Sequence, residues 1–291
     1  MILIIACIVA WLVLANLCGS FWLAVVVHLS TAAALAVFVN FGFHPFRASR
    51  VSLWVGRLLM RVSLDKASRD ILASLDPKRQ YIFACEPHGQ APLHLSFIFA
   101  AHGGATMQPA LHEKTVVMGH TLIAMFPFMC QLFQLYGVTF SAEQTVQRAL
   151  QLGAHMALCP SGLAGKLESI NRDNYNNHGE KHQVFVVRRS LPRIMKLAAE
   201  RKALIVPVLS PNEDRAFWNL NPFETTSLFS SFALGNEWFV RPFCAINVRI
   251  GAPIDSGNFS PRSASDLQSL TNLYYEKLSE LAKPDYTLIL R

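Results

Sequence analysis

Residues 81–101, YIFACEPHGQAPLHLSFIFAA, give the strongest indication of the fold of this protein. The apolar beginning, Tyr81–Cys85, predicts a buried strand, and the stretch near Pro92–Ala101 predicts a helix. Between them, Pro87 fixes the direction of the chain and Gly89 lets backbone amides come close to a ligand. We therefore expect a turn at the carboxyl end of a strand, where ligands bind in parallel sheets.

Strand-like and helix-like stretches alternate along the rest of the chain, which predicts an α/β fold. Strands are expected at Tyr81–Cys85, Thr115–Met118, His155–Cys159, Leu204–Val208 and Ala245–Ile250. Helices are expected near Pro92–Ala101 and at Leu122–Tyr136, Gln144–Leu152, Leu191–Lys202 and Asp266–Ala282. Because the strands are apolar throughout, we expect a largely parallel sheet flanked by helices. Two polar stretches are expected to be long loops, Gly165–Gln183 and Ser210–Arg241.

The composition restricts the class of protein. Of the 291 residues, 52% are hydrophobic and 15% are charged, and the formal net charge is +7. Ordinary soluble domains have about 25% charged residues, so these values exclude a disordered chain and argue against a purely soluble protein. A basic and apolar chain favours anionic lipids and phosphorylated substrates as partners over nucleic acid. The six cysteines form no Cys-x-x-Cys pair, which argues against a zinc site and a secreted disulfide framework.

The first 46 residues contain no Asp, Glu, Lys or Arg. Asn16, Gly19 and Ser20 divide this stretch into two apolar pieces, Ile2–Leu17 and Phe21–Val39. One crossing needs roughly 20 residues, so the pattern predicts an N-terminal transmembrane or re-entrant helical hairpin. A signal peptide would need a basic start and a shorter apolar run. The basic residues that follow the hairpin are expected to stay on the cytosolic side.

Three segments follow from this reasoning: a membrane hairpin at 1–46, a basic amphipathic membrane-surface segment at 47–78, and a cytosolic-face α/β domain at 79–291. Within the second segment, Val51–Met60 has apolar residues at helical spacing with arginines opposite, which is typical of a helix on the membrane surface. A core helix of the α/β domain is the alternative for this stretch.

His88 is the first candidate for chemistry, because it stands in the turn after the strand. A neutral imidazole is the usual general base for a hydroxyl group, and amides at the start of a helix can hold an oxyanion. A structural histidine is the alternative. His178 and His182 are four residues apart but have no third ligand nearby in the sequence, so no metal site is expected.

Glu86-Pro87-His88-Gly89 resembles the His/Glu-Pro-His-Gly/Ser signature of the type-2 diacylglycerol acyltransferase family, which includes monoacylglycerol acyltransferases and wax synthases. Other stretches resemble the family's blocks in the same order: Thr115–Pro127, Leu135–Val138, Cys159–Gly162 and Lys196–Val208. The hydrophobic hairpin with its basic flank is also typical of that family. The resemblance covers most of the chain and implies a glycerolipid acyltransferase-like fold for residues 79–291.

The resemblance implies transfer of a fatty acyl group from acyl-CoA to the hydroxyl of diacylglycerol, which makes triacylglycerol without any cofactor. His88 would be the general base, and Glu86 would hold its imidazole in the correct tautomer. Pro87 and Gly89 would shape the turn whose amides hold the oxyanion. A surface carboxylate at the end of the strand is the alternative for Glu86.

Coenzyme A carries phosphates, so the resemblance also implies a cationic binding region. The candidates are two groups, one in the glycine-rich loop and one in a basic cluster: Ser161, Gly162 and Lys166, then Arg188, Arg189, Arg193 and Lys196. A solvated basic face beside an anionic membrane is the alternative. The family's glycine-rich loop usually ends in Glu, whereas Ser161–Gly165 contains none.

The remaining expectations concern the acyl acceptor, the cellular location and self-association. Phe140–Glu143 supplies no cation for an acceptor phosphate, which favours a neutral lipid alcohol. Alternatives are another acceptor (monoacylglycerol, a fatty alcohol or a lysophospholipid) and a catalytically silent membrane or lipid-droplet protein. We expect the endoplasmic reticulum membrane as the location, with the active domain facing the cytosol and transfer to lipid droplets as an option. Self-association into a homo-oligomer is left open.

Overall fold

The computed structural model describes residues 60–86, 93–99, 107–119, 133–134, 137–140, 143–160, 183–187, 192–211, 213 and 244–290. The expected N-terminal hairpin, nearly all of Leu122–Tyr136 and most of the two expected long loops lie outside these ranges. Among the helices that are described, none combines the length and the apolar character needed to cross a membrane.

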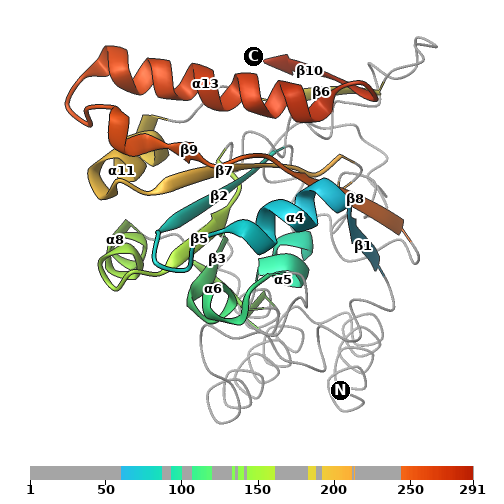
Figure 1. Ribbon diagram of the computed structural model, residues 1–291, viewed down its shortest axis with the longest axis horizontal. Helices are drawn as coiled ribbons and strands as arrows, with labels where there is room; N and C mark the ends of the chain where they lie inside the picture. Colours follow the sequence, from blue (N-terminus) through green and yellow to red (C-terminus); the bar gives the residue numbers. More distant parts are fainter. Residues whose placement is uncertain are drawn as a thin grey trace, which may run out of the picture.

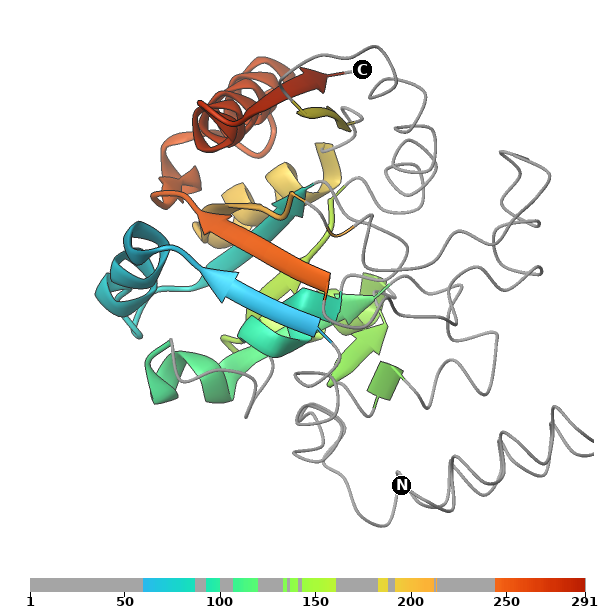
Figure 2. The same cartoon turned by 90° about the vertical axis from the view of Figure 1, so that its right-hand side faces the viewer.

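An eight-stranded sheet forms the centre of the domain (Figures 1 and 2). Its order is β1 (Met60–Leu64), β8 (Cys244–Ile250), β7 (Leu204–Leu209), β2 (Tyr81–Glu86), β5 (His155–Leu158), β3 (Thr115–Gly119) and β4 (Val138–Phe140), and β9 (Ile254–Asp255) also pairs with β7. The strands from β7 to β4 are all parallel, whereas β8 and β9 run antiparallel to β7. The expected largely parallel α/β sheet is confirmed, with an antiparallel edge that was not expected.

Helices cover both faces of this sheet, as Figure 1 shows. One hydrophobic cluster joins it to α4 (Lys66–Ser74), α5 (Leu93–Phe99) and α6 (Pro109–Lys114). The other cluster joins it to α8 (Glu143–Gln151), α11 (Pro192–Arg201) and α13 (Ala264–Ala282). A 3-10 turn, η3 (Ser256–Asn258), precedes α13, and a separate parallel pair is formed by β6 (Gln183–Val187) and β10 (Tyr286–Leu290). Four of the expected helices correspond to α5, α8, α11 and α13, and their ends differ from the observed ones by two residues or fewer. The fifth, Leu122–Tyr136, lies almost entirely outside the described residues.

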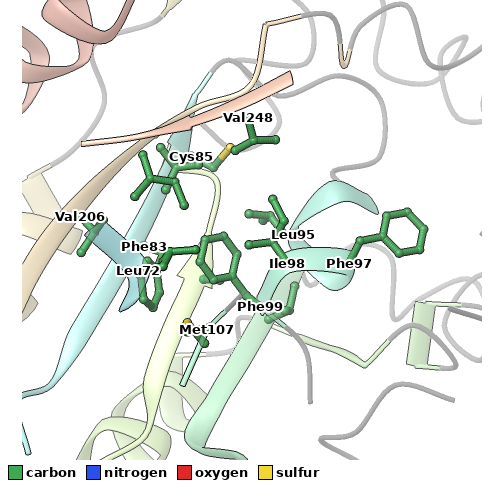
Figure 3. Packing of buried hydrophobic residues seen from close by; sticks show 14 of the residues in the cluster. Leu72, Phe83, Cys85, Leu95, Phe97, Ile98, Phe99, Met107, Val206 and Val248 are labelled. Atoms are coloured by element: carbon green, nitrogen blue, oxygen red, sulfur yellow. The ribbon is translucent and has the colours of Figure 1, made fainter. Parts of the chain in front are cut away.

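Strand β2 lies at the centre of the sheet, and all six of its residues are buried. Its side chains alternate between the two faces: Phe83 and Cys85 belong to one cluster, and Ile82 and Ala84 belong to the other. The Phe83 ring lies 4.4 Å from the Phe99 ring of α5, centroid to centroid, within the cluster drawn in Figure 3. The strand that carries Glu86 is therefore held by packing on both sides.

Residues 60–78, part of the segment expected on the membrane surface, contribute a strand and a helix to this domain. β1 pairs with β8 in parallel, from Met60 opposite Cys244 to Leu64 opposite Val248. Asp65 caps α4 by accepting a hydrogen bond from the Ser68 amide at 2.7 Å. The boundaries of the three segments stay predictions.

His155 is a buried histidine at the beginning of β5, on the opposite edge of the sheet from Glu86. Its exposed fraction is 1%. Its Nδ1 accepts a hydrogen bond from the Tyr81 amide at 3.3 Å, and its Nε2 has no hydrogen-bond partner within the part of the chain that the structure describes. Burial, together with the smaller effect of the Lys114 charge, lowers the pKa of His155 to about 4. The ring is therefore neutral in the folded protein at neutral pH.

Because the pKa of His155 is lowered in the folded protein, we expect the stability of the protein to depend on pH. Below the ordinary pKa of about 6.5 the unfolded chain binds a proton that the folded protein does not. The free energy of unfolding is therefore expected to fall by up to about 3 kcal/mol from pH 6.5 to pH 4. Unfolding of the detergent-solubilised protein at several pH values measures this slope. A His155→Gln variant should show a shallower slope, and equal slopes in the two proteins would contradict the prediction.

Candidate active site

The carboxyl ends of β2 and β5 form the candidate site. The two strands are neighbours and parallel, with Ala84 opposite Leu158. The helix that follows β2, α5, packs on one face of the sheet, and α11, which directly precedes β7, packs on the other face. Ligands bind in parallel α/β sheets beyond the carboxyl ends of the strands. Glu86 and Cys159 lie at this point, at the ends of β2 and β5.

Glu86 is the last residue of β2, and only 1% of it is exposed. It pairs in register with Leu209 of β7, and its carbonyl oxygen accepts a hydrogen bond from the Ser210 amide at 3.1 Å. The Tyr274 hydroxyl from α13 donates to the Ala84 carbonyl at 3.2 Å, two residues before Glu86. The alternative of a surface carboxylate is therefore wrong for Glu86. Its role toward the imidazole stays a prediction.

Cys85 of β2 and Cys159, which follows β5, bring two thiols together at the ends of these strands. Burial raises the pKa of the Cys159 thiol, a hydrogen bond with Cys85 raises it further, and the charges of Glu213 and Glu86 act in the same direction. Thiols with raised pKa values are protonated at neutral pH and are poor nucleophiles. Cys159 is therefore not arranged to act as a covalent nucleophile.

Two further buried polar residues follow β7, and the sequence analysis assigned neither of them to the site. Ser210 and Glu213 are each 1% exposed. Among the described residues, the Ser210 hydroxyl has no hydrogen-bond partner. Both residues fall inside the expected loop Ser210–Arg241, where polar residues are ordinary. The sequence could have indicated them, because they come shortly after an apolar strand. The carboxyl ends of parallel strands meet at one edge of the sheet, so residues that follow β7 lie near the end of β2.

Most other expected site residues lie outside the described residues: Pro87, His88, Gly89, Ser161, Gly162, Lys166, Arg188 and Arg189. Their assigned roles remain predictions. His178 and His182 also lie outside the described residues. Within the ranges that are described, no group of three or more His, Cys, Asp or Glu side chains could hold a metal ion.

Arg193 and Lys196 are both exposed on the first half of α11. The end of α11 connects through two residues to the start of β7, so the beginning of the helix is directed toward the carboxyl edge of the sheet. Lys196 Nζ lies 3.9 Å from an oxygen of Glu200. Exposed ion pairs at this distance are weak, so the ammonium group can exchange this carboxylate for a phosphate. The amides at the beginning of α11 add positive potential.

The chain was compared with known proteins. No protein-family model matches it. Diacylglycerol O-acyltransferase 2 of Dictyostelium discoideum is 23% identical over 260 residues, which cover 82% of this chain and 76% of the relative. This chain is an acyltransferase that resembles diacylglycerol O-acyltransferase 2. The crystal structure of the 1-acyl-sn-glycerophosphate acyltransferase of Thermotoga maritima gives a TM-score of 0.46 at 12% identity and covers 97% of both chains. The similarity to diacylglycerol O-acyltransferase 2 confirms, at the level of enzyme class, the resemblance drawn from the sequence motifs.

Proposed function

We propose that this acyltransferase moves a fatty acyl group from acyl-CoA to the free hydroxyl of diacylglycerol and so makes triacylglycerol. The observation that carries the proposal is the position of Glu86, the first residue of Glu86-Pro87-His88-Gly89, buried at the carboxyl end of the central parallel strand. The motif begins where α/β sheets bind their ligands. The similarity to diacylglycerol O-acyltransferase 2 supports the choice of acceptor.

In the proposed mechanism His88 is the general base. Its neutral imidazole takes the proton of the acceptor hydroxyl while the oxygen forms a bond to the thioester carbonyl carbon. Backbone amides near Gly89 stabilise the resulting oxyanion. When the intermediate collapses, the bond between carbon and sulfur breaks, and the imidazolium returns the proton to the thiolate of CoA. The thioester is already activated, so no nucleophilic side chain is needed, which agrees with the raised pKa of the Cys159 thiol.

The CoA phosphates are proposed to bind Arg193 and Lys196, together with the basic and glycine-rich residues expected from the sequence. Reversing both charges, in Arg193→Glu with Lys196→Glu, is expected to raise the KM for acyl-CoA about tenfold or more, because two phosphate contacts become repulsive. Arg201→Glu is the matched control, since Arg201 is exposed at the other end of α11. Steady-state kinetics with varied acyl-CoA measures the effect, and an unchanged KM in the double variant would contradict this assignment.

A neutral acceptor is proposed because Phe140–Glu143, which includes the end of β4, contains no Arg, Lys or His. The test uses membranes that contain the full chain, radiolabelled acyl-CoA and one acceptor at a time: diacylglycerol, monoacylglycerol, a fatty alcohol and a lysophospholipid. The highest kcat/KM is expected for diacylglycerol. A preference for another alcohol would correct the acceptor alone, whereas no transfer to any acceptor would overturn the proposal in favour of a catalytically silent protein.

We also propose that the enzyme works in the endoplasmic reticulum membrane with its active domain on the cytosolic side. The support is the uncharged stretch 1–46 followed by a basic flank. Water-insoluble acceptors dissolve in the bilayer, so an active domain next to the membrane shortens the path of the alcohol to the imidazole. Protease protection of a tag placed after Arg291 in sealed microsomes tests the orientation, and a protected tag would contradict it.

A further inference from the structure

Two buried serines lie at opposite ends of β7, and their hydroxyl groups differ in what they bind. Ser256 is fully buried beside the start of the strand, where its hydroxyl donates to the Ala203 carbonyl at 2.5 Å. Ser210 directly follows the last residue of the strand and is 1% exposed. Its hydroxyl forms no hydrogen bond in the part of the chain that the structure describes. The unused hydroxyl therefore lies at the carboxyl edge of the sheet, which is the edge of the candidate site.

A buried hydroxyl without a hydrogen bond destabilises the folded protein. Burial removes the water that solvates the group, and nothing replaces that water. Nearly all buried polar side chains in native proteins are therefore hydrogen-bonded, and an exception needs a specific reason such as a ligand. Alanine at position 210 would avoid this cost without breaking a hydrogen bond. The Ser210 hydroxyl is therefore suited to bind a group that arrives with a substrate.

The Ser210 side chain lies on the face of the sheet that α5 covers. The Ser210 amide donates to the Glu86 carbonyl at 3.1 Å, so the pairing of β7 with β2 continues through this residue. Side chains alternate between the two faces along a paired strand. Val208 belongs to the hydrophobic cluster that includes α5, and Leu209 belongs to the other cluster. Ser210 therefore shares the face of Val208.

The two faces offer different chemistry to a substrate. α11, which carries the cations proposed for the CoA phosphates, packs on the face opposite to that of Ser210. The face of Ser210 carries the apolar cluster of which Figure 3 shows a part. One neutral hydroxyl in apolar surroundings suits the ester carbonyl of a lipid, because it donates to the carbonyl oxygen without adding a charge. A phosphate would be matched better by a cation.

We propose that Ser210 is an acceptor-binding residue, whose hydroxyl donates a hydrogen bond to an ester carbonyl oxygen of diacylglycerol. This inference rests on the proposed function and deepens it, since it concerns how the acceptor is selected. Diacylglycerol has two ester carbonyls beside its free hydroxyl, so a bond to one of them orients the alcohol. The Ser210 hydroxyl is then satisfied when the acceptor is bound, which accounts for a hydroxyl at this buried position.

The first test is the stability of the protein without substrates. Ser210→Ala is expected to leave the midpoint of thermal unfolding unchanged or to raise it by about 1–3 °C, because a polar group without a hydrogen bond is removed. Ser256→Ala is the matched control and is expected to lower the midpoint by about 2–6 °C, because the bond to Ala203 is lost. A midpoint lowered equally in both variants would show that the Ser210 hydroxyl serves the fold, and would overturn the inference.

The second test compares two lipids that differ in their linkage, 1,2-diacylglycerol and 1,2-dialkylglycerol with chains of equal length. Both have the free hydroxyl, but the ether-linked lipid has no carbonyl oxygen. Equilibrium binding of each radiolabelled lipid to the full chain in detergent micelles measures the preference. The wild type is expected to bind the diacyl lipid about three- to tenfold more tightly, the contribution of one neutral hydrogen bond, and Ser210→Ala should lose most of this preference. Ser210→Cys keeps the size but has a weak donor, so it should resemble Ser210→Ala.

Acyl transfer to the same two lipids gives the corresponding kinetic result. The ratio of kcat/KM for the diacyl lipid to that for the dialkyl lipid should fall in Ser210→Ala by the same factor, and it should stay unchanged in Ser256→Ala. An equal ratio in the wild type and in Ser210→Ala would overturn the inference, even if Ser210→Ala loses activity toward both lipids. Such a uniform loss would assign the hydroxyl to the thioester or to packing.

The two proposals fail in different ways. If the wild type binds the diacyl lipid with a preference that depends on Ser210 but transfers no acyl group to either lipid, the proposed function is wrong and the binding role stands. If acyl transfer occurs with a preference that does not depend on Ser210, the proposed function stands and the present inference is wrong.

Discussion

Replacing His88 by alanine is expected to lower kcat for acyl transfer by about 10²–10⁴-fold, the usual contribution of a general base. The hydroxyl of a lipid alcohol holds its proton tightly at neutral pH, so attack on the thioester requires a group that accepts this proton. Alanine removes the acceptor and leaves the oxyanion-binding amides in place, so a small residual rate is expected. Initial rates with labelled acyl-CoA and diacylglycerol at saturation measure the loss.

His94→Ala is the matched control, because His94 lies six residues further along the same segment, within α5. Its activity is expected to stay within a few-fold of the wild type. If His88→Ala kept the activity of the wild type, the proposed mechanism would be wrong. Equal large losses in both variants would show that the segment tolerates no substitution, and His88→Gln, which keeps the bulk of the side chain, would then decide between base and packing roles.

The largest loss of stability is expected for Phe83→Ala in β2. The Phe83 ring is fully buried, and it lies 4.4 Å from the Phe99 ring and 6.1 Å from the Tyr81 ring, centroid to centroid. Removal of a buried ring costs its transfer free energy and leaves a cavity, so the free energy of unfolding is expected to fall by about 3–5 kcal/mol. The midpoint of chemical unfolding in detergent measures this loss.

Two substitutions serve as controls for this prediction. Phe83→Leu keeps most of the volume and should cost about 1.5 kcal/mol or less. Leu152→Ala removes a side chain that is 76% exposed and should change the stability by less than about 0.5 kcal/mol. If Phe83→Ala cost no more than Leu152→Ala, the assignment of β2 to a tightly packed core would be wrong.

The central strands were predictable because each carries its own signal. Tyr81–Cys85 and Leu204–Val208 are apolar throughout, and strands buried on two faces have that pattern. The short elements were not predicted. β1 has five residues, with Val62 and Leu64 packed against the core, so its alternation is too brief to distinguish from a helix. The antiparallel pairing of β8 and β9 with β7 could not be predicted either, because the pattern of apolar residues does not give the direction in which two strands pair.

The position of Glu86 at the end of a buried strand was predictable from the sequence. The apolar strand and the motif that begins with Glu86 are contiguous along the chain. Glu213 was missed because it joins Glu86 only through the pairing of β2 with β7, whose ends are far apart along the chain. The burial of Glu86 could not be deduced either, since it depends on the neighbouring strands and on Tyr274 of α13.

The separation of α5 and α11 onto opposite layers has a consequence for how such an enzyme can diversify. The helix after β2 and the helix before β7 rest on different hydrophobic clusters, so a substitution that loosens one leaves the support of the other intact. The two layers can then change separately over evolution, while Tyr81–Glu86 stays fixed in the sheet between them.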